Sequence, residues 1–138
     1  MYLLDTDVVS ELRKGARANR GAVAFLRDAQ AARRAVYLSV ITLGELRHGI
    51  EKVRHRGDAS QSALLEKWLD RVTGEFEGQI LPFGEEAAQV WGRLLVPHAQ
   101  NIVDKQVAAI ALVHGLTVVT RNTAHYKPTG AALENPFV

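Results

Sequence analysis

Short apolar runs rich in β-branched residues alternate with longer amphipathic segments along this chain, and this alternation constrains the fold more than any other feature of the sequence. The apolar runs predict strands at Tyr2–Leu4, Val36–Ile41, Ile80–Phe83 and Leu116–Thr120. The segments between them have apolar residues at helical spacing and predict helices at Val8–Lys14, Gly21–Ala32, Thr42–Arg56, 58–72, Glu85–Gln100 and Asp104–His114. We expect the remaining C-terminal residues to form a loop and a short tail. Strands separated by helices predict an α/β fold, a sandwich with a mostly parallel central sheet and helices on both faces.

The composition is that of an ordinary globular protein, with 47% hydrophobic and 23% charged residues. We expect a single domain over residues 1–138, because the chain has no internal repeat and no linker. The absence of cysteine excludes disulfides, thiolate metal sites and cysteine nucleophiles. The first apolar run meets Asp5 at once, and no later run approaches the length of a membrane helix, so we expect a cytoplasmic protein without a signal peptide.

Basic residues are concentrated in the first part of the chain. Residues 1–56 contain 11 Lys and Arg against 6 Asp and Glu, whereas residues 57–138 contain 6 against 9. A basic face of this kind binds polyanions such as RNA, although solvated helix faces are the simpler explanation of the charges. The asymmetry becomes informative only together with an independent sign of phosphodiester chemistry.

Several polar residues near the ends of predicted elements have simple local explanations. Thr42 and Glu45 have the spacing of a capping box, in which the glutamate reaches back to the first residue of the helix. Asp104 suits the first turn of a helix, and the simplest interpretation of Lys105 is a solvated charge. Asn122 suits a turn after the last predicted strand.

The joint placement of four of these residues favours a second interpretation. Asp5 and Asn122 follow predicted strands, and Glu45 and Asp104 lie at the beginning of predicted helices. Such positions gather at one edge of a parallel sheet, where clustered carboxylates repel one another unless a cation lies between them. Carboxylate and amide oxygens suit Mg²⁺ or Mn²⁺ better than zinc. The pattern is typical of metal-assisted phosphodiester hydrolysis.

The sequence resembles PIN-domain proteins, and closely the VapC toxins of prokaryotic toxin–antitoxin pairs. The matching stretches, spread over nearly the whole chain, are LLDTDVVSEL, LSVITLGELRHGI, IVDKQVAAIAL, VVTRNTAHY and NPF. The resemblance implies Mg²⁺- or Mn²⁺-dependent cleavage of RNA by a compact α/β/α sandwich. It also implies a homodimer or a larger toxin–antitoxin assembly, inhibited by a cognate VapB-type antitoxin.

The resemblance transfers roles to individual residues. Asp5, Glu45 and Asp104 match the three acidic residues of the family's metal site. Thr120 matches the hydroxyl position just before the fourth ligand, and Asn122 matches that fourth position, where many relatives have Asp. Because an amide has no charge, the number of metal ions stays open.

A second departure is Asp7, where relatives often have Asn. Asp7 either adds charge near the metal or caps the following helix. Thr6, between the two aspartates, is a secondary site residue, and His125 is either a substrate contact or a plain loop residue. The basic residues expected to contact RNA are Arg121, Arg13 and Lys14.

Two other functions compete with the ribonuclease. Asp5 and Asp7 also have the spacing of the haloacid-dehalogenase phosphatases, in which Asp5 would be the nucleophile and Asp7 the acid and base. That alternative leaves Glu45 without a role and lacks a later acidic pair for Mg²⁺. A PIN-like module that binds RNA or a partner without cutting is the other alternative, because the fourth acid is missing.

Overall fold

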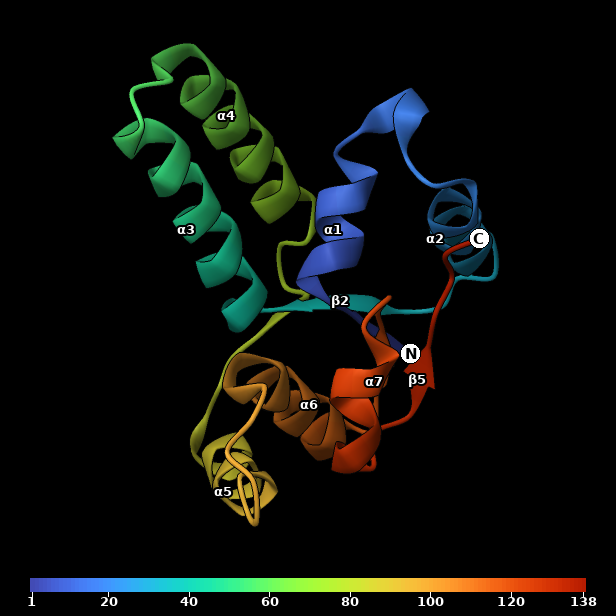
Figure 1. Ribbon diagram of the computed structural model, residues 1–138. Helices are drawn as coiled ribbons and strands as arrows, with labels where there is room; N and C mark the ends of the chain where they lie inside the picture. Colours follow the sequence, from blue (N-terminus) through green and yellow to red (C-terminus); the bar gives the residue numbers. More distant parts are fainter.

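A five-stranded sheet in which every neighbouring pair is parallel forms the centre of the protein (Figure 1). The computed structural model describes all residues 1–138. The strand order is β3-β2-β1-β4-β5. The strands are β1 (Tyr2–Leu4), β2 (Val36–Ser39), β3 (Ile80–Leu81), β4 (Thr117–Val119) and β5 (Leu133–Glu134).

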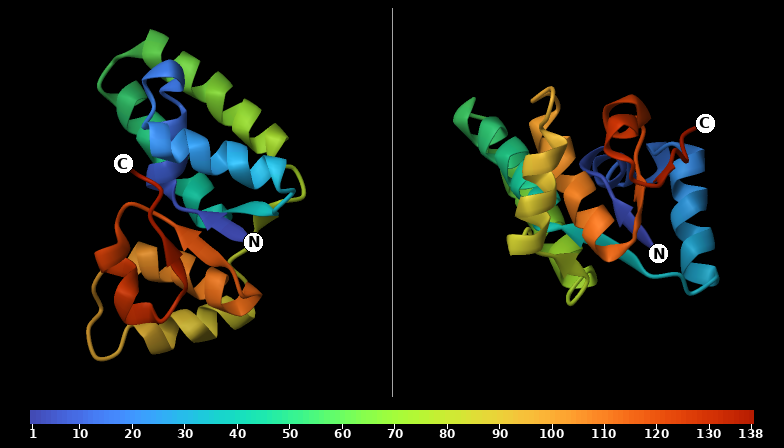
Figure 2. Two further views of the ribbon diagram at one scale, coloured as in Figure 1. Left: turned by 90° about the vertical axis from the view of Figure 1, so that its right-hand side faces the viewer. Right: turned by 90° about the horizontal axis from the view of Figure 1, so that it is seen from below.

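Helices cover both faces of the sheet, as the alternating pattern predicts (Figures 1 and 2). One layer contains α1 (Thr6–Leu12), α2 (Arg20–Ala31), α3 (Val40–His55) and α4 (Ala59–Glu75). The other contains α5 (Glu85–Leu94), α6 (Ile102–His114) and α7 (Thr123–Tyr126). Two short 3₁₀ turns lie at Gly15–Arg17 and Lys127–Thr129. None of the helices combines the length and the apolar character needed to cross a membrane.

Successive residues of the central strands point into different cores, which explains why these strands are apolar throughout. In β1, Leu4 packs with α1 to α4, whereas Leu3 packs with α5 to α7. In β4, Val119 packs with α1 to α4, whereas Val118 packs with α5 to α7. All four side chains are at most 1% exposed. The two cores therefore fix β1 and β4 side by side in the middle of the sheet.

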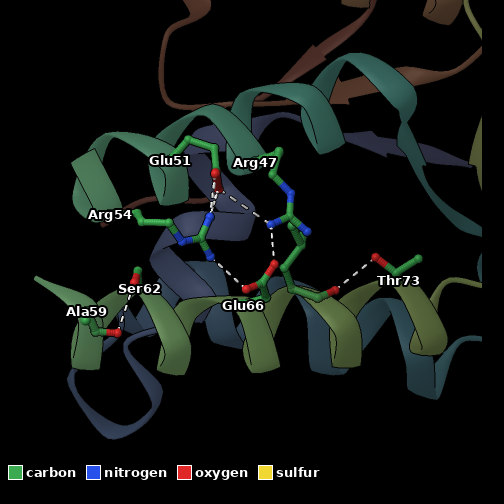
Figure 3. A network of polar contacts seen from close by, with 8 residues as sticks. Arg47, Glu51, Arg54, Ala59, Ser62, Glu66 and Thr73 are labelled. Carbon is green, nitrogen blue, oxygen red and sulfur yellow. Dashed lines mark hydrogen bonds and ion pairs between the residues drawn. The ribbon is translucent and has the colours of Figure 1, made fainter. Parts of the chain in front are cut away.

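The helices α3 and α4 form a hairpin that extends away from the sheet (Figure 1). A network of ion pairs on its exposed side joins the two helices (Figure 3). Arg47 binds Glu66 at 2.6 Å, and Arg54 binds both Glu66, at 2.7 Å, and Glu51. Because these side chains are about half exposed, water and salt weaken the pairs, and the apolar contacts beneath them contribute more to the hairpin.

The ends of several elements differ from the prediction. Helix α1 begins at Thr6 rather than Val8, because Asp5 accepts a hydrogen bond from the Thr6 amide and caps it. Helix α5 ends at Leu94, six residues before the predicted end at Gln100. The expected C-terminal loop and tail contain both α7 and β5, whose few residues are too short for a periodic signal.

The interpretation of Lys105 as a solvated charge was wrong. This residue is 6% exposed, in the first turns of the almost entirely apolar helix α6. Its ammonium group donates a hydrogen bond of 2.7 Å to the carbonyl oxygen of His98. Lys105 therefore fastens the segment before α6 to the helix.

Candidate functional site

We call the region just beyond the carboxyl ends of β1 and β4 the crevice, because the strand order reverses between these two strands. From β1 the chain adds β2 and β3 on one side of the sheet, and it then returns to add β4 and β5 on the other side. In open parallel sheets, ligands bind where the order reverses in this way, just beyond the strand ends. Asp5 follows β1 directly and Thr120 follows β4 directly, so both residues lie at this point.

The carboxylate of Asp5 is buried at the centre of the crevice. Its Oδ1 accepts a hydrogen bond from the Thr6 amide at 2.8 Å, and its Oδ2 accepts one from the Thr120 hydroxyl at 2.9 Å. The side chain is only 3% exposed. Burial, and then the neighbouring Asp7 carboxylate, raises the pKa of Asp5 from 3.8 to about 7. The charged form of Asp5 is therefore disfavoured at this position, and a cation beside it would favour that form.

Asp7 is the second carboxylate of the crevice. It does not cap α1, because Asp5 occupies the N-cap position of that helix. Its Oδ2 accepts a hydrogen bond of 2.9 Å from the Arg121 amide and lies 3.4 Å from the Thr120 hydroxyl. Its Oδ1 is buried and has no hydrogen-bond partner. Burial raises the pKa of Asp7 as well. An unpartnered buried carboxylate oxygen is costly without a ligand, so this atom marks a place for a cation or a bound water.

Thr120 joins the two aspartates to the loop after β4. The residue is fully buried, and its hydroxyl donates to Asp5 while it accepts from the amide of Asn122 at 3.0 Å. Asn122 occupies the N-cap position of α7, but its side chain makes no capping hydrogen bond. The structure thus brings the main chain of Asn122 to the site and leaves its amide side chain free.

Glu45 reaches the site through a threonine, and the capping-box prediction for it was wrong. Ser39 is the N-cap of α3, and its hydroxyl accepts from the Thr42 amide at 3.1 Å. The Glu45 carboxylate instead accepts a hydrogen bond of 2.6 Å from the hydroxyl of Thr6. Since Thr6 also donates its amide to Asp5, this one residue links both acids.

Asp104 lies in the first turn of α6, where the helix dipole favours an acid. Its Oδ2 lies 2.8 Å from Nδ1 of His125, and its charge contributes to the raised pKa of Asp5. Asp104 therefore faces the same crevice. His125 belongs to α7 rather than to a loop, and it contacts a predicted metal ligand.

The oxygens at the site are of the kind that binds a hard divalent cation, although the acidic side chains do not yet converge on one point. No group of three or more Asp, Glu or His side chains already converges on one point that could hold a metal ion. Asp5 and Asp7 are nevertheless desolvated, one Asp7 oxygen lacks a partner, and the Oδ1 atom of Asp104 is free of hydrogen bonds. Carboxylate oxygens of this kind are the ligands that Mg²⁺ and Mn²⁺ prefer.

Sequence reasoning missed Tyr126, a buried residue close enough to Asp5 and Asp104 for their charges to act on it. Its side chain is fully buried, and its hydroxyl has no hydrogen-bond partner. Burial, and then the charges of Asp5 and Asp104, raises the pKa of Tyr126, which keeps the phenol neutral. Its only signal in the sequence is a large aromatic residue within a segment otherwise typical of a loop.

The three basic residues expected to contact RNA have different surroundings. Lys14 forms an ion pair with Glu11 at 3.0 Å, which neutralises its charge. Arg13 lies over the ring of Trp68 at 5.9 Å, and neither it nor Arg121 pairs with a carboxylate. The charges of the two arginines therefore stay available to an anionic ligand.

The comparison with known families decides the identity of this fold. The family model described as "PIN domain" matches residues 2–130. The chain belongs to the PIN-domain family. The mixed α/β architecture with its five-stranded parallel sheet is the one seen in structures of this family, so the predicted fold class is confirmed.

This PIN domain has relatives along its entire length. It is 34% identical to the toxin FitB of Neisseria gonorrhoeae over 99% of each chain. It is 32% identical to the VapC ribonuclease Y4jK of Sinorhizobium fredii, over 99% of this chain and 98% of that one. The crystal structure of FitAcB from Neisseria gonorrhoeae superposes with a TM-score of 0.83 at 32% identity, covering 99% of this PIN domain and 98% of that chain.

Proposed function

We propose that this PIN domain is a metal-dependent endoribonuclease, and that it is the toxin of a VapBC-type toxin–antitoxin pair. The proposal is supported by its relatives, which include a toxin and a VapC ribonuclease, each similar over the whole chain. The single observation that supports the chemistry is the pair of desolvated aspartates at the strand-order reversal, with one carboxylate oxygen left unpartnered.

Asp5, Asp104 and Glu45 would hold the cation, with Asn122 as a neutral fourth residue. A bound Mg²⁺ or Mn²⁺ supplies activation of water and neutralises charge on the phosphodiester oxygens. Thr6 and the capped start of α1 orient the acids, since Thr6 donates its amide to Asp5 and its hydroxyl to Glu45.

On the other side of the crevice, Thr120 holds Asp5 at 2.9 Å. Asp7, held by the amide of Arg121, adds negative charge beside Asp5, which strengthens the attraction of the site for a cation.

The RNA would contact the exposed face beside the crevice. Arg121 follows Thr120 immediately, and its guanidinium has no carboxylate partner, which suits it to a phosphate. Arg13 adds a second free cation, whereas Lys14 contributes less because Glu11 neutralises it. Contacts of this type position a nucleic acid backbone and do not select a base sequence.

A protein partner is part of the same proposal. An apolar cleft of about 360 Å³ lies between α1, α2 and α4 and is lined by residues that include Leu12, Val23, Leu26, Trp68 and Phe76. An amphipathic segment of a VapB-type antitoxin would cover such a surface. We further propose that the toxin acts in the cytoplasm, as a homodimer or within a larger complex with its antitoxin.

Cleavage of RNA by purified, antitoxin-free protein tests the proposal. We expect cutting of a mixed RNA pool with Mn²⁺ or Mg²⁺, none with EDTA, and none with the folded variants Asp5→Asn and Asp104→Asn. Asp70→Asn is the matched control, because it removes one exposed carboxylate on α4, outside the crevice. Full activity of both crevice variants would refute the assignment of the site.

The same experiment separates the two alternatives. The family match leaves the phosphatase hypothesis without support, since the matched family is the PIN domain. A module that binds RNA without cutting predicts binding of RNA by the wild type and no cleavage with either metal.

A further inference from the structure

The segment that follows β5, Asn135–Val138, packs against the beginning of α2 through a specific set of contacts. Asn19 donates its side-chain amide to the Val138 carbonyl at 2.9 Å and accepts from the Val138 amide at 3.2 Å. The carbonyl of Pro136 passes directly over Gly21, where a Cβ atom would lie only 2.0 Å from it. Figure 1 shows the C-terminus beside α2. Hydrogen bonds and close packing therefore hold residues Asn135–Val138 against the start of α2.

Further hydrogen bonds hold Asn19, the residue that binds this segment. The Asn19 amide donates to the buried Glu11 carboxylate at 3.0 Å, which ties the start of α2 to α1. The Asn19 side chain also accepts from the Gly21 amide at 3.0 Å and so caps α2. One asparagine thus fixes both the helix and the C-terminal segment.

The segment presents Phe137 to Arg121. The guanidinium carbon of Arg121 lies 4.7 Å from the centre of the Phe137 ring, a distance at which a cation is attracted to the aromatic face. Phe137 is half-buried and packs against the core formed with α1 to α4. Arg121 is exposed and has no ion pair, so apart from the longer-range attraction of Asp7 and Glu11 the ring is the contact that restrains its guanidinium.

Arg121 is consequently held at two points. Its main-chain amide donates to Asp7 in the crevice at 2.9 Å, while its guanidinium rests on Phe137. The parallel sheet explains the arrangement, because β4 and β5 are neighbours whose carboxyl ends open to the same edge. The loop after β4 and the segment after β5 therefore meet beside the site.

We propose that Phe137 is a positioning residue that holds the Arg121 guanidinium in place for a phosphate of the RNA substrate. The proposal rests on the ribonuclease function proposed above. A free arginine side chain loses much conformational freedom when it binds a phosphate. A side chain already held on a ring loses less, and the substrate binds more tightly.

Binding of RNA in the presence of EDTA tests the proposal without cleavage. The probe is a fluorescent single-stranded oligoribonucleotide, and its anisotropy gives the Kd. Phe137→Leu keeps an apolar side chain but removes the aromatic face, and we expect it to weaken binding by about two- to fivefold. Phe137→Tyr keeps the face and restores the wild-type Kd. In cleavage assays, Phe137→Leu raises KM and leaves kcat unchanged.

Arg121→Ala is the reference variant. It weakens binding more strongly and lowers the slope of log K against log salt by about 0.7, the value for one phosphate contact on a single strand. Adding Phe137→Leu to Arg121→Ala should have no further effect, because the ring then has no guanidinium to hold. A full effect of Phe137→Leu in the Arg121→Ala background would overturn the positioning role.

A second measurement does not depend on RNA. In NMR spectra, the Nε–H proton of Arg121 should show a ring-current shift that Phe137→Leu abolishes and Phe137→Tyr retains. Absence of this shift in the wild type would overturn the proposal. If the wild type binds RNA but Phe137→Leu binds equally well, only the positioning role fails. If the wild type neither binds nor cuts RNA, the ribonuclease function fails, and the proposed role of Phe137 fails with it.

Discussion

The buried carboxylate of Asp5 should make the metal-free protein less stable at neutral pH than in mild acid. In the folded protein its pKa is about 7, whereas in the unfolded chain it returns to about 3.8. Between these two values the folded state binds the proton more tightly, so the free energy of unfolding falls as the pH rises. Above pH 7 the penalty reaches a constant value of about 4 kcal/mol, which is 2.303RT times the difference between the two pKa values.

Asp5→Asn should therefore stabilise the protein while it abolishes cleavage. The amide still accepts from Thr6 but loses the charged acceptor for Thr120, which offsets part of the gain. We expect a net gain of roughly 2 kcal/mol at pH 7.5, or a rise in Tm of about 6 °C. Near pH 4, where the unfolded-state aspartate is itself half protonated, the difference should largely vanish.

Urea denaturation in EDTA at pH 4, 5.5 and 7.5 measures this effect. Asp70→Asn changes the net charge equally at an exposed position of α4 and should follow the wild type at every pH. A divalent metal should raise the Tm of the wild type, since it binds only the folded state, and should not raise that of Asp5→Asn. The reasoning is refuted if Asp5→Asn is less stable than the wild type at pH 7.5, or shows the same dependence on pH.

Two further predictions concern the neighbours of the site. Gly21→Ala should destabilise the protein by about 2 kcal/mol or more, because the added Cβ would displace Pro136. Gly44→Ala should stabilise the protein by about 1 kcal/mol, because Gly44 lies in the exposed interior of α3 and an added Cβ would have no atom within 4 Å. Thermal unfolding of both variants checks this pair, and equal effects would contradict it. Thr6→Val should lower cleavage at least about tenfold without changing stability by more than ~1 kcal/mol, because it frees Glu45, and Thr6→Ser should restore the rate. A Thr6→Val enzyme with the wild-type rate would exclude an orienting role for this hydroxyl.

The alternation of apolar and amphipathic segments was enough to predict the class of fold. Strand and helix periodicity are local properties, so each long element could be recognised without its partners. The strand ends also predicted that Asp5 and Asn122 would lie at one edge, because the carboxyl ends of parallel strands must do so, and the main chain of Asn122 does reach Thr120 beside Asp5. The roles of the acidic residues in metal binding stay predictions until cleavage is measured.

The short elements could not be predicted in the same way. Helix α7 and strand β5 are too brief for a periodic signal, and β5 forms because β4 offers an unpaired edge beside it. Their presence changes the site, since α7 holds both His125 and Tyr126. A segment that looked like a plain loop therefore supplies one contact to Asp104 and one buried phenol beside the aspartates.

By itself, the sequence determined which residues could be buried and in what order helices and strands follow one another, because hydrophobic periodicity acts over a few residues. Only the tertiary structure decided which polar groups meet. Thr6 and Glu45 are 39 residues apart, and Asp5 and Thr120 are 115 apart, so no spacing within one element encodes these contacts. The same holds for the burial of Lys105 and for the ring of Phe137 beneath Arg121. These contacts exist because the packing of two helical layers on one sheet brings distant side chains to a common edge, where burial and charge then set their chemistry.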